Sequence, residues 1–273
     1  MFRAERSNST LGSTFSLLEL IYHATVRSVR RSHGNALLGL LMNMFQTVLL
    51  VATFYVMIDL LGMRRAAIRG DFLLYVMSGI FMFMTHTKAI GAVFSSEGPT
   101  SQMMKHAPMT TAVSITSAAL GVLYIQVLSA TTVLYFYHVA ISHIEIYNLL
   151  GSFAMLLLSW FTGVSIGMVF LALKPWAPDI VGMFQAVFSR VNMIASGKMF
   201  LANTLPHKML VLFDWNPLFH TIDQTRGYAF INYNPHFSSW QYPLYVGLAL
   251  LMIGLMGEFY TRQYASVSWG ARQ

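Results

Sequence analysis

The most regular feature of the chain is a series of long apolar stretches separated by short polar ones. A helical stretch of about 20 apolar residues crosses a hydrocarbon core of about 30 Å. Six stretches fit this pattern: Ala36–Ile58, Phe72–Phe94, Thr111–Tyr137, Ile146–Leu173, Ile180–Leu201 and Tyr242–Gly257. The pattern predicts an all-α membrane protein with six transmembrane helices. Lys88 lies close enough to the end of the second span for its ammonium group to snorkel to the interface.

A different periodicity precedes the first span. Between Thr14 and Arg31, apolar residues fall on one side of a helix, and a ladder of Glu19, His23, Arg27 and Arg31 steps by four along another. We predict an amphipathic helix that lies along the headgroup layer. A surface helix packed on a partner is the alternative. The chain therefore divides into a segment 1–33 with this helix and a single transmembrane domain, 34–273.

Composition agrees with a membrane protein. Hydrophobic residues make up 56% of the chain and charged residues 10%, where soluble domains carry about 25%. There is no cysteine, which excludes disulfides, thiolate metal sites and a cysteine nucleophile. The net charge of +7 comes from dispersed residues that form no stripe, so it indicates topology and contact with membrane lipids, with no nucleic-acid partner.

The basic residues also predict orientation. The side that holds both termini carries nine of them: Arg3, Arg6, Arg27, Arg30, Arg31, Lys105, Lys174, Arg262 and Arg272. The opposite side carries Arg64, Arg65, Arg69, Lys208 and Arg226, with Lys198 at the boundary. Because basic residues are more frequent on the cytoplasmic side of membrane proteins, this difference predicts that both termini lie in the cytoplasm. The three arginines in the first external loop favour the opposite orientation.

The fifth predicted span contains an unusual charge. Arg190 lies about ten residues into this span, roughly 15 Å deep. An arginine there costs about 2.5 to 3.5 kcal/mol on insertion scales, so its side chain should face protein or water. Lys198 follows two turns later, on broadly the same side. Either these groups line a conduit for an anionic ligand, or they bind a carboxylate or carbonyl of a neighbouring span.

Catalytic motifs are absent. Gly197-Lys198 looks like the end of a phosphate-binding loop, but Asn192 stands five positions before Gly197, and Met199 replaces the Ser or Thr that would hold magnesium. The nine histidines lack the spacing that places two ligands on one helical face, and no Gly-x-Ser-x-Gly elbow occurs. We expect no metal site and no enzyme activity in this chain.

Two polar segments remain. The connector 95–110 contains Glu97-Gly98-Pro99 and has the size of a short cytoplasmic docking helix. The region 203–240 contains two Asn-Pro dipeptides that start turns around a short helix. In that helix, Asp223 and Arg226 are spaced as a local pair. The aromatic residues in and just after this region either stack on sugar rings or form an interfacial belt. They are Tyr228, Phe230, Tyr233, Phe237, Trp240 and Tyr242.

This order of parts resembles the permease subunit of type-2 ATP-binding cassette exporters, and most closely the inner-membrane permease of capsular polysaccharide export. The span order is similar over nearly the whole chain, and no internal repeat typical of a secondary transporter is found. The more specific likeness lies in Ser196-Gly197, Leu205-Pro206, Asn216-Pro217-Leu218-Phe219-His220, Asp223, Arg226 and Tyr233-Asn234-Pro235. The basic first external loop and the Ser/Gly/Pro-rich connector depart from the family pattern.

The resemblance implies a homodimer in the bacterial inner membrane that binds two copies of a separate ATPase subunit. That subunit would hold ATP and magnesium, and this chain would hold no cofactor. The exported substrate would be a lipid-linked polysaccharide, passed on to periplasmic and outer-membrane components. The alternatives are a same-fold exporter of a drug or lipid, an integral-membrane enzyme, and a passive scaffold.

The resemblance also implies roles for particular residues. The connector would act as a coupling helix, with the N-terminal helix beside it: Glu97, Gly98, Pro99, Lys105, Arg27 and Arg31. The region 203–240 would form short re-entrant helices that gate the outer mouth: Asn216, Pro217, His220, Asp223, Arg226, Asn234 and Pro235. The substrate path would include Arg190, Lys198, Tyr228, Tyr233 and Trp240.

Overall fold

The computed structural model describes residues 10–31, 36–60, 71–98 and 110–264, and the regular structure within these ranges is all helical. The elements are α1 Thr10–Arg31, α2 Ala36–Leu60, α3 Phe72–Phe94, α4 Thr111–Ala140, α5 Leu149–Leu173, α6 Pro178–Ala195, the 3-10 turn η3 Ala202–Thr204, α7 His207–Phe213, α8 Pro217–Ala229 and α9 Gln241–Tyr264. The predicted all-α class is confirmed for this part of the chain. The basic loop 61–70 and most of the connector, with Pro99 and Lys105, lie outside the described residues.

Five of the described helices are long and apolar enough to cross a membrane, namely α2, α3, α4, α5 and α9. The predicted span Ile180–Leu201 is not among them. Its helix, α6, ends at Ala195 after 18 residues, about 27 Å. The early end has a local cause, because Gly197 has φ 70°, in the left-handed region, and turns the chain out of the helix.

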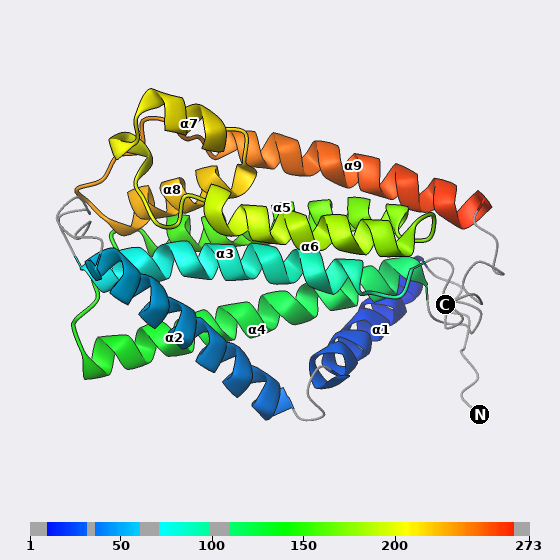
Figure 1. Cartoon of the computed structure of the whole chain (residues 1–273). Helices are drawn as coiled ribbons and strands as arrows, with labels where there is room; N and C mark the ends of the chain where they lie inside the picture. The colour runs from blue at the N-terminus through cyan, green and yellow to red at the C-terminus, as the bar shows by residue number, and fades with distance from the viewer. Residues whose placement is uncertain (1–9, 32–35, 61–70, 99–109, 265–273) are drawn as a thin grey trace.

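Helix α3 forms the centre of the bundle. Its side chains are buried along nearly its whole length, and it contacts α2, α4, α5 and α8. Asp71 caps its start by accepting hydrogen bonds from the N–H groups of Leu73 and Leu74. Figure 1 shows α3, α4, α5 and α9 running alongside one another, with α7 and α8 at one end of the bundle. A helix that is apolar all round needs such an enclosed position.

Helices α3 and α5 approach closely because α5 presents glycines to α3. A Cβ atom on Gly163 would lie 2.5 Å from the carbonyl oxygen of His86, and one on Gly167 would lie 2.9 Å from the Cβ of Val93. Polar bonds join the same two helices, since His86 Nδ1 lies 3.1 Å from both the carbonyl oxygen of Ser159 and the hydroxyl oxygen of Thr162. The Gly-x-x-x-Gly pattern in α5 therefore serves close helix packing.

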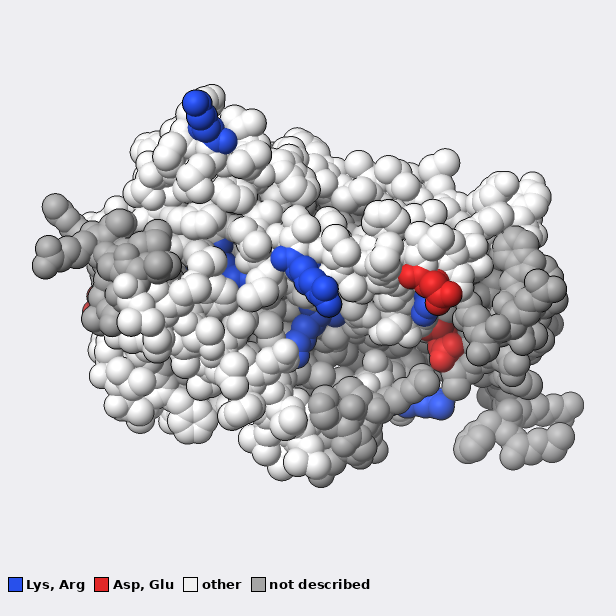
Figure 2. Space-filling view, in the orientation of Figure 1, with Lys and Arg blue, Asp and Glu red and all other residues white. Residues whose placement is uncertain are grey.

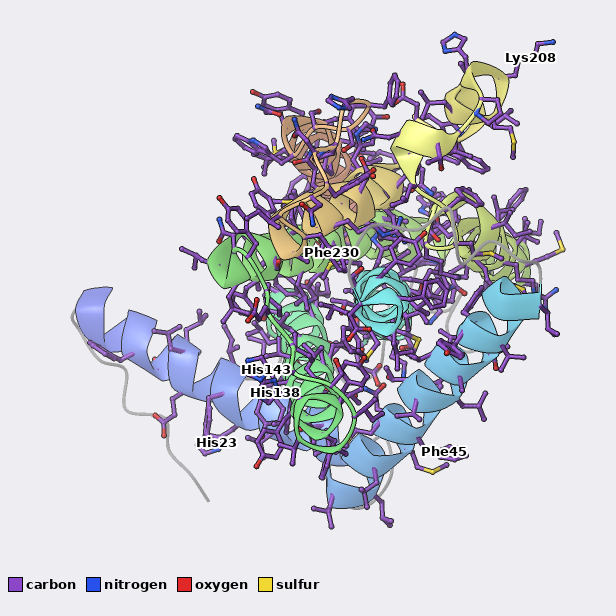
Figure 3. All side chains as sticks on the ribbon, turned by 90° about the vertical axis from the view of Figure 1, so that its left-hand side faces the viewer. His23, Phe45, His138, His143, Lys208 and Phe230 are labelled. Carbon is purple, nitrogen blue, oxygen red and sulfur yellow. The ribbon has the colours of Figure 1, made fainter. Side chains whose placement is uncertain are left out.

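Helix α2 is attached to this core by polar side chains. The ammonium group of Lys88, on α3, donates to Asn43 Oδ1 and to Gln46 Oε1, the latter at 2.8 Å. Gln126 Nε2, on α4, donates to the same Asn43 oxygen at 3.0 Å. Lys88 thus binds α2 to the bundle, and the expectation that it snorkels to the interface stays a prediction. Figure 3 shows Phe45 on the opposite side of α2, pointing away from the bundle.

The predicted amphipathic helix forms α1 and packs against α4. A Cβ atom on Gly121 of α4 would lie 3.5 Å from both Ser28 and Val29 of α1. The apolar side chains of Phe15 and Tyr22 remain exposed. Figure 1 shows α1 inclined to the long helices, at the end of the bundle opposite α7 and α8.

The glycine contact gives a test of the packing. Gly163→Ala should lower the free energy of unfolding by about 1 to 3 kcal/mol, because the added methyl group meets backbone atoms of α3 that cannot move independently. Gly91→Ala, where an added Cβ meets no atom within 4 Å, is the matched control and should be neutral or stabilising by up to about 1 kcal/mol. Thermal unfolding in detergent measures both. Equal melting temperatures for the two variants would contradict the close contact.

Candidate functional site

The first Asn-Pro dipeptide begins α8, as its pattern predicts. Asn216 Oδ1 accepts a hydrogen bond from the N–H of Leu218 at 3.0 Å, and Pro217 takes the first helical position. Asn216 Nδ2 donates to Asn192 Oδ1 at 2.8 Å and to the carbonyl oxygen of Ala195 at 2.9 Å. One buried amide therefore caps α8 and ties it to the end of α6.

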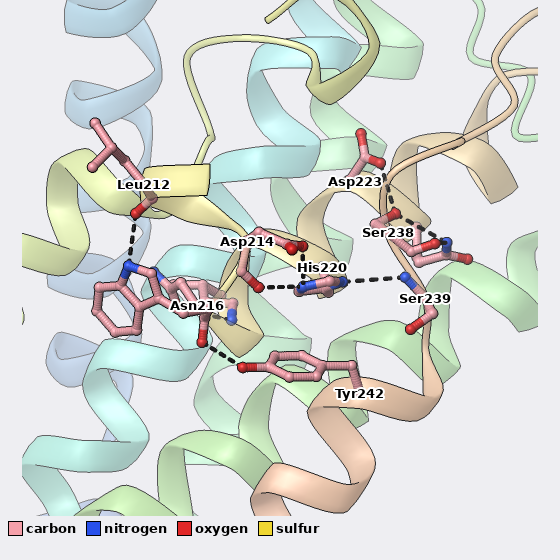
Figure 4. A network of polar contacts seen from close by, with 11 residues as sticks. Leu212, Asp214, Asn216, His220, Asp223, Ser238, Ser239 and Tyr242 are labelled. Atoms are coloured by element: carbon pink, nitrogen blue, oxygen red, sulfur yellow. Dashed lines mark hydrogen bonds and ion pairs between the residues drawn. The ribbon is translucent and has the colours of Figure 1, made fainter. Parts of the chain in front are cut away.

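His220 joins α8 to the segments on either side of it (Figure 4). Its Nδ1 atom accepts from the N–H of Ser239 at 3.2 Å, since a backbone N–H only donates. Its Nε2 atom then carries the hydrogen and donates to the carbonyl oxygen of Asp214 at 2.7 Å. The ring also packs on Tyr242 at a centroid distance of 4.6 Å, and the Tyr242 hydroxyl donates to the carbonyl oxygen of Trp215 at 2.8 Å.

Asp223 lies inside this region, with only 1% of its surface exposed. Its carboxylate accepts hydrogen bonds from the hydroxyls of Tyr233 and Ser238, the latter at 2.7 Å. Burial and the neighbouring Asp223 charge raise the pKa of Tyr233 above its usual range. Tyr233 is therefore a buried donor to Asp223, and its ring is not an exposed surface for sugar stacking.

Arg226 is 1% exposed and binds the turn that follows α6. Its Nη1 atom donates to the carbonyl oxygens of Gly197 at 3.2 Å and Phe200 at 2.7 Å, and its Nη2 atom donates to that of Lys198 at 2.7 Å. The turn leaves these carbonyls without helical partners, and a guanidinium supplies several donors in a fixed plane. The turn and α8 are thus held by one side chain.

The predicted local pair between Asp223 and Arg226 does not form. Among the described residues, no ion pair joins the two side chains, because Arg226 binds carbonyl oxygens and Asp223 binds hydroxyls. The Arg226 guanidinium also lies over the ring of Tyr75 on α3, 4.2 Å from its centroid. Sequence spacing along α8 does not reveal these partners, which come from other elements.

Lys198 and Arg190 point to different environments, so the expectation that they share a side is wrong. Lys198 is 3% exposed, with its ammonium nitrogen 3.5 Å from the ring centroid of Phe83 on α3 and 4.8 Å from that of Phe54 on α2. Its ammonium has no hydrogen-bond partner within the described chain. Arg190, in contrast, is exposed on α6. The early end of α6 separates the two, since Lys198 lies beyond the turn at Gly197.

Large apolar side chains surround Arg190 on the uncovered face of α6. The exposed ones are Ile180, Met183, Phe184, Val187, Val191, Met193 and Ile194. Figure 2 shows Lys and Arg side chains near the middle of one face of the molecule, surrounded by uncharged residues.

The aromatic residues after α8 divide by exposure. Tyr228 packs on α5, where a Cβ atom on Gly151 would lie 2.6 Å from its ring, and Phe230 is buried. Phe237 and Trp240 are each nearly half exposed. Of the predicted substrate-path aromatics, Trp240 alone keeps an exposed ring of that size.

The second Asn-Pro dipeptide closes the region. The carbonyl oxygen of Asn234 accepts from Asn203 Nδ2 at 2.7 Å, and Asn203 Oδ1 accepts from the N–H of His236 at 3.2 Å. The ring of Pro235 packs closely on Gly227 of α8, because a Cβ atom added to Gly227 would lie 2.7 Å from Cδ of Pro235. This turn therefore binds both η3 and α8.

A second feature lies at the opposite end of the bundle. A groove of about 670 Å³ is lined by α1, by residues 95–97 and by α4, and both Arg27 and Glu97 line it. The N–H of Glu97 donates to Ser114 Oγ at 3.0 Å, and Gly98 lies near Leu171. The structure thus brings two of the predicted coupling residues to one surface. The side chain of Arg31 lies outside the described residues.

Within the described ranges, no group of His, Asp and Glu could hold a metal ion.

The sequence pattern did not predict a polar cluster that joins α2, α3 and α4. Its members are Asn43, Gln46, Lys88 and Gln126. The sequence feature that could have revealed them is the rarity of long polar side chains within apolar spans.

Comparison of the chain with known protein families and with curated proteins gives no match.

Arg226→Lys tests the carbonyl-binding role. We expect it to lower the free energy of unfolding by about 3 kcal/mol, because an ammonium group cannot reach three carbonyls and the ring of Tyr75 together. Arg262→Lys, at an exposed position near the end of α9, is the control and should change stability by less than about 0.5 kcal/mol. Unfolding in detergent gives both values. A stable Arg226→Lys protein would show that these bonds are dispensable.

Proposed function

We propose that this chain is the permease subunit of an ATP-driven exporter that moves a lipid-linked, capsular-type polysaccharide outward across the bacterial inner membrane. It acts as a homodimer with two copies of a separate ATPase. In this proposal α6 makes the sixth crossing, α7 and α8 enter the outer mouth of the conduit, and both termini are cytoplasmic. The sequence resemblance supplies the substrate class, and the structure supports a conduit.

The observation that carries the proposal is the position of Arg190. It is exposed on α6, about 18 Å from the start of that helix and about 7.5 Å from its end at Ala195. Helix α6 contacts α5, one of the helices that could cross the membrane, and Figure 1 shows α6 extending along the bundle. An arginine at such depth faces protein or water. The face that bears it therefore needs either a covering protein or an aqueous path, and a dimeric conduit supplies both.

The large apolar side chains beside Arg190 favour a second copy of the chain as the covering protein. Helix α2 has a similar outward face, with Phe45 and Leu41 exposed, and it is held to the bundle mainly on its opposite side. Two copies that pack through α2 and α6 would bury these faces and leave the arginines toward a shared path. A homodimer with a two-fold axis is the commonest way to satisfy such a surface.

Helix α8 has the properties expected of an element that enters the membrane from one side. Arg226 of α8 lies over the ring of Tyr75, and Lys198, in the turn that Arg226 binds, lies close to Gly79. Helix α8 therefore lies beside the first two turns of α3. Non-spanning segments at such depth must bury their polar groups in protein. The bonds of Asn216, His220, Asp223 and Arg226 meet this requirement, and they support a rigid gate element at the outer mouth.

The groove at the other end suits an ATPase contact. It joins α1, the start of the connector and α4, and its lining includes both an arginine and a glutamate. A partner docked there would contact α1 and the connector together. Movement of that partner would displace α4. Because Gln126 of α4 donates to Asn43, it would also displace α2.

The experiment that tests the function is reconstitution with an ATPase. The chain should co-purify with the ATPase encoded beside it, and ATP hydrolysis in vesicles should rise several-fold when this chain is present. A rise with a lipid-linked glycan supports the polysaccharide, while a rise only with drugs or lipids supports the alternative substrate class. No ATPase partner and no stimulation would refute an exporter.

Arg190→Gln tests the conduit. Export should fall at least tenfold, because the variant removes the charge while insertion, dimerisation and ATPase binding remain. Lys208→Gln is the control, since Figure 3 shows Lys208 at the outer tip of α7, pointing away from the bundle. Export is measured as surface polysaccharide in cells with equal amounts of membrane protein. Normal export by Arg190→Gln would exclude a role for this charge in the path.

A further inference from the structure

The polar cluster at α2, α3 and α4 has more hydrogen-bond donors than acceptors. Asn43 Oδ1 accepts from both Lys88 and Gln126, and Gln46 Oε1 accepts from Lys88. These oxygens are therefore occupied. The amide nitrogen of Asn43 is buried and has no partner within the described chain. The groups left over, including the amide nitrogen of Gln46 and the remaining N–H of the ammonium, are donors.

The cluster has no nearby acid in the helices that form it. Helices α3 and α4 contain no Asp or Glu, and α2 and α6 contain one each, at their ends, as Asp59 and Asp179. The Lys88 charge is thus balanced only by amide oxygens. A buried or half-buried cation without a carboxylate attracts an anion strongly, because the low dielectric raises the electrostatic energy.

The cluster is accessible and lies at membrane depth. Gln46 is exposed and Lys88 is half-buried. Lys88 is six residues from the end of α3, about 9 Å inside the helix end. A ligand that reaches the cluster therefore meets donors and positive charge inside an apolar surface.

We propose that Asn43, Gln46 and Lys88 form a binding site for the phosphate group of an amphiphile. The phosphate oxygens accept from the Lys88 ammonium and from the amide nitrogen of Gln46, the groups of the cluster that reach the surface, and the unpartnered amide nitrogen of Asn43 lies behind them. The site itself stands on these contacts. Its role, to hold the phosphate-bearing end of the exported lipid, rests on the proposed function.

Gln46→Glu separates a binding site from a structural clamp. A carboxylate still accepts from Lys88, so α2 stays attached or is held more strongly, but the positive charge of the cluster is neutralised. A purely structural cluster would be unharmed. Gln241→Glu, at an exposed position at the start of α9, makes the same chemical change away from the cluster and is the control.

The measurement is binding of dodecyl phosphate to the purified chain in neutral detergent, followed by thermophoresis. Inorganic phosphate and dodecyl maltoside are the comparison ligands. We expect dodecyl phosphate alone to bind tightly, Gln46→Glu to weaken it at least tenfold without lowering the melting temperature, and Gln241→Glu to match the unchanged chain. Equal binding by Gln46→Glu, or no binding by the unchanged chain, overturns the site, and equal affinity for inorganic phosphate overturns the amphiphile.

Export by Gln46→Glu cells tests the role separately. Loss of both binding and export supports a site on the substrate path. Loss of binding with normal export overturns that role. If the unchanged chain stimulates no ATPase, the proposed function fails, and the binding experiment still decides whether the phosphate site exists.

Discussion

The outer end of the molecule depends on the need to satisfy backbone carbonyls where α6 stops. The turn at Gly197 leaves the carbonyl oxygens of residues 197, 198 and 200 outside any helix, in a region that is largely buried. One guanidinium binds all three and also lies over Tyr75 of the central helix. Because the arginine belongs to α8, the end of α6, the position of α8 and the surface of α3 are fixed together. The remaining bonds of α8 then hold this assembly to the two Asn-Pro turns.

The two sides of the bundle are built in different ways. Helices α3, α5 and α9 pack closely, with glycines at the contacts of α5 with both neighbours. In a membrane, such close packing replaces much of the hydrophobic driving force that stabilises soluble cores. Helices α2, α6 and α9 leave large apolar side chains exposed, and α6 also leaves one arginine uncovered. Close helix contacts within the bundle are thus combined with apolar outer faces, which is typical of helices that face membrane lipids or another protein chain.

Much of the fold follows from the sequence because apolar length and turn chemistry are local properties. The starts of α3 and α4, the end of α5 and the Asn216 cap all lie where the pattern predicts. The end of α6 was missed, since a left-handed Gly197 outweighs an apolar run that continues past it. The site was harder to predict. Arg226 has an acidic neighbour one helical turn away, yet its partners are carbonyls whose positions depend on how two distant segments meet. Lys88 likewise had no visible partner until α2 was placed beside it.

The attachment of α2 has a consequence for the way the chain is made. The donors that bind Asn43 stand 45 and 83 residues later in the sequence. When the ribosome has just completed α2, neither Lys88 nor Gln126 exists, so the first span enters the bilayer with a polar amide that has no partner. The full set of hydrogen bonds at Asn43 can form only after Gln126 of α4 has been synthesised. The attachment of the first span is therefore completed out of chain order, after two later helices have been made.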